Sequence, residues 1–404
     1  MSMATETITT TLPMRKNTTY LKLLSAQIIS LIGTGISSLT LALLAWELEA
    51  EGASAVLGTA FALKMIAYVG LAPVFGAVAH KLPRKQFMFA LDIIRAGLIL
   101  CLPLVTQSWQ IYVLVFVINA CSAGFTPLFQ STLPQILPDR DQYVRALSYS
   151  RMAYDLEQII SPLLTAMLLL LIGFRDLFIL DALTFILSGV LIISCTLPAV
   201  MPVDHGRGVW NNLKFGIQSY LETPRLRALW VAYLAAAGAS AMVIVNTVVY
   251  INQVLEGGDR ETALAMAVVG FGSMMVALKL PGWLEKRTIR PFMIAGGVSI
   301  SLALLFGALT PSWPGFVAVC LLLGIGMSCI QTPAGVLVTR SCKEPDAPAF
   351  FAAHFSLSHL WWFFTYLLAG WSSAAIGLSM SYLLMGGLCT VSLIVVSLMF
   401  PRED

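Results

Sequence analysis

Long apolar stretches, separated by short polar connections, dominate the pattern along the chain. A helix needs about 20 mostly apolar residues to cross the hydrocarbon core of a bilayer, and twelve stretches of the sequence meet that requirement. They lie near 20–46, 54–79, 85–106, 109–134, 145–173, 176–197, 225–253, 260–282, 289–310, 313–340, 347–376 and 379–400. The pattern predicts an all-α membrane protein with twelve transmembrane helices.

Composition supports this class and excludes others. The 404 residues are 58% hydrophobic and 11% charged, whereas about a quarter of the residues in soluble domains are charged. The net charge of +3 is too small to favour nucleic acid as a partner. The seven cysteines are scattered through apolar stretches without a C-x-x-C motif, so we interpret them as packing residues. The expected surroundings are a lipid bilayer.

Lysine and arginine gather on one side of the predicted membrane. With the N-terminus inside, all but four of the 24 basic residues fall in inner loops, inner helix ends or tails. The exceptions are Arg175 and Arg260 outside, and Lys64 and Arg95 within spans. Because positive residues favour the cytoplasmic side, we predict a multi-pass protein of a bacterial inner membrane with both termini in the cytoplasm.

The longest polar stretch separates two groups of six predicted spans. Basic loops of similar composition, "HKLPRKQF" at 80–87 and "EKRTIRPF" at 285–292, follow the second and the eighth span. Such a recurrence suggests an internal repeat. The predicted organisation is a cytoplasmic tail over 1–19, six-helix bundles over 20–197 and 225–400, a cytoplasmic middle loop over 198–224 and a cytoplasmic tail over 401–404.

The stretch "GAVAHKLPRK" at 76–85 resembles a loop signature of the major facilitator superfamily, Gly-x-x-x-Asp-Arg-x-Gly-Arg-Arg/Lys. The positions that fit are Gly76, Lys81, Arg84 and Lys85, whereas His80 replaces the Asp and Pro83 the second Gly. "LDIIRAGLIL" at 91–100 and "GFTPLFQSTLPQILP" at 124–138 resemble macrolide-efflux proteins and siderophore exporters. "SRMAYDLEQIISP" at 150–162 and "HFSLSHLWW" at 354–362 resemble permeases related to nickel-resistance proteins.

The resemblance implies two six-helix bundles around a central cavity, lined by spans 1, 2, 4, 5, 7, 8, 10 and 11. It also implies alternating access by rocking of the two halves. The sequence contains no G-x-x-x-x-G-K-[ST], G-x-S-x-G or H-E-x-x-H motif, so we expect neither ATP-driven transport nor an enzyme, and no cofactor. We therefore expect a secondary carrier, and the resemblance favours protons over sodium as the coupling ion.

Charged residues inside the predicted spans are the first candidates for function, because a charge at the bilayer centre costs at least ~2.5–3.5 kcal/mol. Lys64 has no acid within one turn of its own span, so we expect it to compensate Asp155 or Glu157 of the fifth span. Arg151 and Asp155 are four residues apart and share a helix face, whereas Glu157 faces elsewhere. Asp155 and Glu157 are candidates for proton coupling, with Arg151 as a further compensating charge. The alternative is a cytoplasmic latch made of all three fifth-span charges.

Three more charges lie in spans that the resemblance places at the periphery. Asp92 and Arg95 of the third span are three residues apart, so their side chains can meet on one helix. We interpret them as a structural ion pair. Asp181 lies in the outer part of the sixth span and has no assigned role.

The predicted eleventh span carries two histidines and a dense group of aromatic residues. Aligning the two halves puts His359 opposite Asp155, so His359 joins the proton-coupling candidates. His354 and His359 are also the candidate metal ligands, although their spacing separates them by about 140° around a helix. Candidates for lining a substrate cavity are the polar and aromatic residues Gln27, Thr34, Ser38, Asn119, Gln130, Asn246, Gln331, Trp361 and Trp362.

These observations favour a proton-coupled exporter of small organic compounds, drug-like or siderophore-like, that acts as a monomer. Its expected partners are the small-molecule substrate, protons and the lipid bilayer. Two alternatives stay open. One is an exporter of divalent nickel, cobalt or iron. The other is a membrane sensor that binds a ligand without transporting it.

Overall fold

A computed structural model describes most of the chain. The described residues are 14–78, 83–137, 139, 142, 146, 149–150, 153, 157, 160–161, 164–197, 209–284, 288–342 and 346–401. Within them the regular structure is helical, and no strand occurs. The predicted all-α fold is therefore confirmed.

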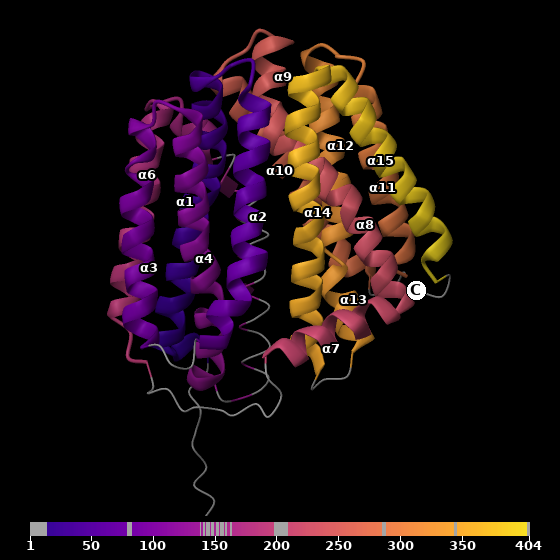
Figure 1. Ribbon diagram of the computed structural model, residues 1–404. Helices are drawn as coiled ribbons and strands as arrows, with labels where there is room; N and C mark the ends of the chain where they lie inside the picture. The colour runs from indigo at the N-terminus through magenta and orange to yellow at the C-terminus, as the bar shows by residue number, and fades with distance from the viewer. Residues whose placement is uncertain are drawn as a thin grey trace, which may run out of the picture.

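The helices follow the apolar stretches of the sequence closely. The main helices are α1 Thr18–Leu48, α2 Ala53–Val78, α3 Arg84–Ile99, α4 Ser108–Ile136, α6 Phe174–Ile193, α7 Val209–Glu222, α8 Pro224–Ala241, α9 Thr247–Gln253, α10 Asp259–Leu284, α11 Arg290–Gly307, α12 Trp313–Gln331, α13 Ala334–Ser341, α14 Ala347–Ile376 and α15 Leu378–Met399. We name the end at which α1 begins and α15 ends the terminal end, and the opposite one the distal end (Figure 1).

Two predicted spans consist of more than one helix. A π-helical turn, Met242–Asn246, joins α8 to α9, and such turns often accompany functional sites in helices. The span over 313–340 is divided into α12 and α13 near Pro333, where the missing N–H cannot continue the helical hydrogen bonds.

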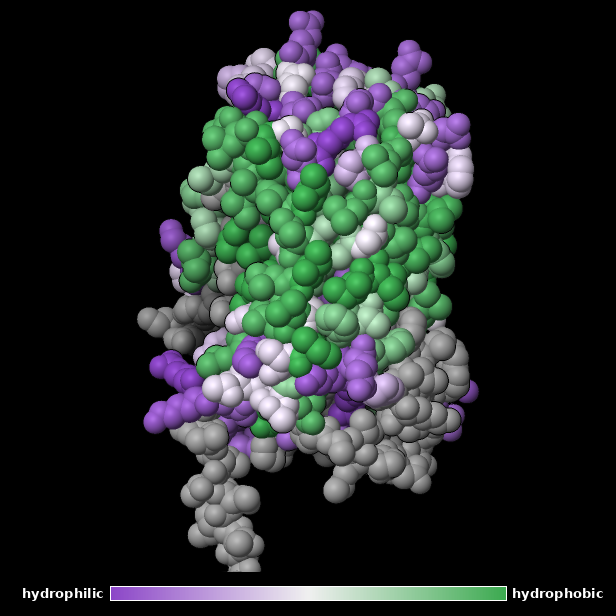
Figure 2. Space-filling model, turned by 90° about the vertical axis from the view of Figure 1, so that its left-hand side faces the viewer, coloured by the Kyte–Doolittle hydropathy of each residue, from purple (hydrophilic) through white to green (hydrophobic). Residues whose placement is uncertain are grey.

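On the face shown in Figure 2, a broad apolar band lies between two more polar ends. Large apolar side chains of the described residues are exposed, among them Leu171, Leu278 and Leu398 at 80%, 75% and 82%, as expected for side chains that face lipid. Ten helical segments of the described chain are long and apolar enough to cross a membrane. The predicted fifth span, 145–173, lies largely outside the described residues, so the number twelve stays a prediction.

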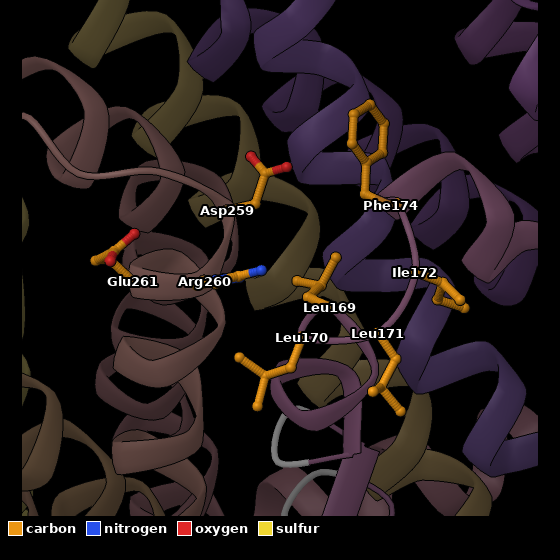
Figure 3. Close-up of a pocket in the computed structure, with 9 residues that line it drawn as sticks. Leu169, Leu170, Leu171, Ile172, Phe174, Asp259, Arg260 and Glu261 are labelled. Carbon is orange, nitrogen blue, oxygen red and sulfur yellow. The ribbon is translucent and has the colours of Figure 1, made fainter.

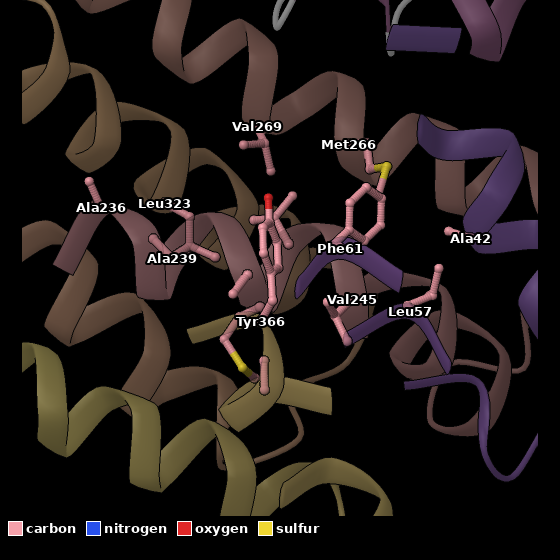
Figure 4. Close-up of a cluster of buried hydrophobic side chains, with 14 of the residues drawn as sticks. Ala42, Leu57, Phe61, Ala236, Ala239, Val245, Met266, Val269, Leu323 and Tyr366 are labelled. Atoms are coloured by element: carbon pink, nitrogen blue, oxygen red, sulfur yellow. The ribbon is translucent and has the colours of Figure 1, made fainter. Parts of the chain in front are cut away.

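The helices form two groups that lie side by side (Figure 1). In the first group α1 packs on α6, α2 on α4 and α3 on α6, and in the second α10 and α11 pack on α12 and α11 on α15. Between the groups, α2 and α14 make the most extensive contact. A buried apolar cluster includes residues of both groups (Figure 4).

Two glycines bring α2 and α14 together at the distal end. A Cβ atom on Gly58 would lie 2.5 Å from the Tyr366 carbonyl oxygen, and one on Gly370 would lie 2.4 Å from the Ser54 carbonyl oxygen. Both distances are too short for a side chain, so the two backbones touch. Small residues commonly allow such close helix contacts in membranes. The two groups are therefore closed against each other at the distal end.

Candidate functional site

Lys64 and Glu157 carry opposite charges in the interior of the molecule. Lys64 lies in the middle of α2, and its ammonium attracts the Glu157 carboxylate. Both side chains are half-buried. Of the two acids that the sequence offers as partners for Lys64, Glu157 is the one that the structure describes, and it lies within electrostatic range of Lys64. Asp155 and Arg151 lie outside the described residues.

The Lys64 ammonium also lies near two aromatic rings of its own helix. Its Nζ atom is 5.8 Å from the ring centroid of Phe61 and 6.0 Å from that of Tyr68. At such distances a ring face attracts a cation. A carboxylate and two rings therefore surround the cation and compensate part of the hydration that it loses in the membrane.

The Glu157 side chain packs against α1 at a glycine. A Cβ atom on Gly35 would lie 2.6 Å from Glu157 Oε1 and 2.2 Å from Ser161 Oγ, so only glycine leaves room for these side chains. Glu157 also lies within electrostatic range of the Tyr366 hydroxyl on α14. The carboxylate is thus positioned by the first helix group and faces a residue of the second.

Aromatic side chains of α14 pack on the two rings beside Lys64 from the second group. Phe61 of α2 stacks on Tyr366, with ring centroids 5.3 Å apart (Figure 4). Further toward the terminal end, the His359 ring lies 6.2 Å from the Tyr68 ring and 5.7 Å from that of Trp362. We name Lys64, Glu157, Phe61, Tyr68, Tyr366, His359 and Trp362 the central cluster. It combines two charges, one imidazole ring and the flat faces of four other aromatic rings.

The two tryptophans predicted to line a cavity have different neighbours. Trp361 stacks on Trp230 of α8 at 4.9 Å and donates from Nε1 to the Trp230 carbonyl oxygen at 2.9 Å. Trp361 is therefore bound within the second group. Trp362 lies against His359 and, edge to face, against Tyr233 at 5.8 Å. Trp362 is thus the tryptophan that belongs to the central cluster.

The two histidines of α14 do not converge on one point. His354 Nδ1 and the Tyr220 hydroxyl of α7 are joined by a hydrogen bond of 2.9 Å, and burial raises the pKa of that hydroxyl, so it stays protonated. His359 Nδ1 instead donates to the Phe355 carbonyl oxygen at 2.7 Å. Among the described residues, no three His, Cys, Asp or Glu side chains gather in a way that could hold a metal ion.

Most of the polar residues predicted to line a cavity form hydrogen bonds with groups of their own or a neighbouring helix. Gln27 Nε2 donates to Ser150 Oγ at 2.7 Å. Thr34, Ser38 and Asn119 each donate to a carbonyl oxygen of their own helix. Gln331 is partly exposed, and the side chain of Gln130 lies outside the described part of the structure.

Asn246, also a cavity candidate, is fully buried in this conformation. Ser54 Oγ donates to its Oδ1 atom at 2.7 Å, and its Nδ2 atom donates to the Ala369 carbonyl oxygen at 3.2 Å. These bonds join the π turn to α2 and α14 next to the glycine contact. Asn246 therefore takes part in closing the distal end.

The loop motif is only partly described. Gly76 lies in α2, whereas Arg84, which is buried, and Lys85 begin α3. His80 and Lys81 lie outside the described residues. The motif's two described basic residues thus stand at the N-terminus of a helix, at the terminal end.

Asp92 and Arg95 form a buried ion pair in α3. Ser188 Oγ of α6 donates to Asp92 Oδ2 at 2.7 Å, and the Arg95 guanidinium lies 4.3 Å from the ring centroid of Phe185. One turn from these contacts, Asp181 is fully buried as well. From the sequence, Asp181 is recognisable only as an acid in the apolar stretch "FILDALTF". The sequence does not indicate which residues contact it.

A separate groove of about 520 Å³ opens at the distal end (Figure 3). Its walls are the apolar residues around the turn before α6, 169–174, and the charged first turn of α10, 259–261. No residue of the central cluster lines it. The groove lies between the two helix groups and is distinct from the candidate site.

A helical bundle with ten described segments able to cross a membrane and a charged pair in its interior defines an integral membrane protein. The chain matches the Major Facilitator Superfamily over residues 23–366 and 229–404. This match covers most of the sequence, and the chain belongs to the Major Facilitator Superfamily.

Curated relatives are similar over part of their length. The chain is 28% identical over 267 residues to the uncharacterized MFS-type transporter YfiS of Bacillus subtilis, a match that spans 63% of this chain and 62% of YfiS. It is 24% identical over 179 residues to Macrolide efflux protein A of Streptococcus pyogenes, which covers 43% of this chain and 44% of that protein. The chain thus matches less than two thirds of the length of each of these two relatives.

Solved structures share the fold. A bacterial homolog to the human lysosomal transporter Spinster, in an inward-facing and occupied conformation, superposes with a TM-score of 0.75 at 14% identity, over 96% of this chain and 98% of that one. The nucleoside transporter NupG superposes with a TM-score of 0.69 at 14% identity, over 94% and 98%. By family the protein is a multi-pass membrane protein of the Major Facilitator Superfamily, and these solved structures share its fold.

Proposed function

We propose that the chain is a proton-coupled exporter of small organic compounds that works by alternating access in a bacterial inner membrane. The observation that carries the proposal is the interior pair of Lys64 and Glu157 beneath the aromatic face of α14. Glu157 is the proton carrier, Lys64 compensates its charge, and the aromatic rings bind the substrate. Both termini lie in the cytoplasm.

The pair is suited to coupling because its two states differ in charge. A deprotonated Glu157 attracts Lys64 of α2. Protonation removes that attraction and leaves an unpaired cation, whose desolvation in the membrane is costly. The electrostatic contact between Glu157 and Tyr366 links this change to the second helix group. Proton binding therefore alters the balance between conformations in which the groups approach each other differently.

The closed distal end fits one state of such a cycle. With the predicted orientation, the contact of Gly58 with Gly370 and the bonds of Asn246 close the outer side of the protein. Substrate then reaches the central cluster from the cytoplasmic side, and rocking of the two groups opens this contact for release. This sequence of steps is the one that export requires.

The chemistry of the central cluster favours an organic substrate. Flat aromatic faces suit apolar and cationic organic molecules, and the relative Macrolide efflux protein A carries an organic substrate class in its name. No observation on the described residues favours a divalent metal, because His354 and His359 have separate partners.

The proposal is tested in proteoliposomes with an imposed pH gradient. The probes are erythromycin, ethidium and Ni²⁺, and the variants are Glu157→Gln and, as a control, Glu222→Gln, which removes an exposed acid at the end of α7. We expect an organic probe to accumulate with the wild-type and control proteins. Glu157→Gln should still bind the probe but fail to accumulate it. Accumulation at the wild-type level in Glu157→Gln would exclude Glu157 as the proton carrier, and accumulation of Ni²⁺ alone would reverse the choice of substrate class.

A further inference from the structure

Asp181 is a buried carboxyl group on α6 that the proposed transport cycle does not use directly. Its side chain is 0% exposed. The described cation that attracts it is Arg95 of α3, and Arg95 already forms an ion pair with Asp92. Two carboxyl groups thus share one guanidinium, so Asp181 depends on hydrogen bonds for most of its stabilisation in the membrane.

These hydrogen bonds tie Asp181 to α1. Ser37 Oγ of α1 donates to Asp181 Oδ2, and Thr184 Oγ1 lies 3.3 Å from Asp181 Oδ1. A Cβ atom on Gly33 would lie 2.2 Å from Asp181 Oδ1 and 2.0 Å from Thr184 Oγ1. Gly33 and Ser37 are four residues apart and share one face of α1. Asp181 therefore presses on that face and bonds to it.

The opposite face of α1 receives Glu157. Gly35 follows Gly33 by two residues, which is about 200° around a helix, and it is the glycine against which Glu157 is seated. Because Gly33 and Gly35 have no side chain, the groups on both faces of α1 contact its backbone directly at these positions. A change in how α1 packs on α6 therefore also changes the packing on the side where Glu157 lies.

We propose that Asp181 is a positioning residue for Glu157. It holds α1 against α6 through Ser37 and Gly33. It thereby fixes the position of Gly35, against which the Glu157 carboxyl group packs. The inference rests on the proposed role of Glu157 as proton carrier. Lys64 of α2 and Tyr366 of α14 are the charged and titratable described groups that face Glu157 from other elements, and neither touches Asp181.

The sequence offers a matched pair of substitutions. Ser37→Ala removes a hydroxyl that donates to Asp181 from α1, and Ser188→Ala removes a hydroxyl that donates to Asp92 from α6. Both delete one bond to a buried carboxyl group of the same network, but only the first loosens α1. Asp181→Asn keeps an oxygen that can accept from Ser37, whereas Asp181→Leu does not.

The titration of Glu157 is measured by infrared difference spectroscopy on the purified protein in lipid, using the carboxyl band that disappears in Glu157→Gln. In Ser37→Ala and Asp181→Leu we expect its midpoint to move about half a pH unit or more to lower pH, because water that enters beside α1 stabilises the carboxylate. Asp181→Asn and Ser188→Ala should keep the wild-type midpoint.

The outcomes separate this inference from the proposed function. A Glu157 band that does not titrate in the wild type overturns both. A band that titrates with the same midpoint in Ser37→Ala overturns the positioning role alone, and so does an equal shift in Ser188→Ala, which would point to general loosening of the network. If Asp181→Leu does not fold, Ser37→Ala alone decides between these outcomes.

Discussion

The two helix groups differ in where they carry charge. Inside its helices the first group contains Lys64, Asp92, Arg95, Glu157 and Asp181. The second has no Lys, Arg, Asp or Glu over 228–255, 262–278, 291–339 or 347–400. Its interior offers two histidines and many aromatic rings instead. Since charges inside a membrane are costly and normally functional, the comparison supports the proposal that the first group carries the proton and that the second provides an apolar binding face.

The largest expected effect concerns the ion pair of the first group. Arg95→Met leaves Asp92 without its cation in a fully buried position, and we expect a loss of about 3–5 kcal/mol in the free energy of unfolding. Chemical or thermal unfolding in detergent measures it. The control is Arg227→Met, an exposed arginine at the start of α8, which should cost at most about 0.5 kcal/mol. Similar losses in the free energy of unfolding for Arg95→Met and Arg227→Met would contradict the view that the interior charges of the first group stabilise its fold.

The charged pair of the central cluster gives the next effect. A double-mutant cycle of Lys64→Met with Glu157→Gln should yield a coupling energy of about 1–3 kcal/mol in stability, because each change alone leaves a charge without its partner. Lys64→Met combined with Glu47→Gln, at the distal end of α1 where Glu47 pairs with Arg175, should be additive. If Lys64→Met were additive with Glu157→Gln but coupled to a substitution of Asp155, the partner of Lys64 would be Asp155.

An effect of similar size is expected where the groups meet. Gly58→Ala puts a Cβ atom 2.5 Å from the Tyr366 carbonyl oxygen, whereas Gly70→Ala in the same helix meets nothing within 4 Å. We expect the first substitution to cost about 1–3 kcal/mol in the distal-closed conformation and to shift the population away from it. Electron spin distances between labels on the distal ends of α2 and α14, in a cysteine-free background, measure this population. An unchanged distance distribution in Gly58→Ala would show that this contact does not hold the distal end closed.

Much of the fold follows from the sequence, because a membrane leaves few choices. Backbone groups in lipid must bond within their own helix, so each apolar stretch defines a helix, and α1, α2 and α14 begin and end within two residues of the predicted limits. The breaks at Met242–Asn246 and at Pro333 were not predicted. The first has no residue signal, whereas the second follows from a proline that periodicity alone overlooks.

The candidate site was predictable in part. An unpaired lysine in an apolar span has to find an acid, so the sequence indicates that Lys64 has a partner in another helix. It does not indicate which acid, since that depends on how α2 and the fifth span pack. The packing of Glu157 against Gly35 and of Asp181 against Gly33 was not predicted either. A glycine in a helix does not indicate which side chain of another helix occupies the space beside it.

The smallest effect distinguishes two histidines of the second group. The His359 ring contacts Tyr68 of the first group, whereas His354 bonds to Tyr220 and lies edge to face with Tyr233 at 4.7 Å. His359→Ala should therefore lower the transport rate about fivefold, as each lost ring contact contributes about 0.5–1.5 kcal/mol. His354→Ala should instead lower stability by about 1 kcal/mol through its lost hydrogen bond and leave transport less affected. Initial rates and unfolding midpoints of both variants, measured side by side, test this. A larger loss of transport in His354→Ala would mean that the second group transmits the cycle through α7 rather than through its contact with Tyr68.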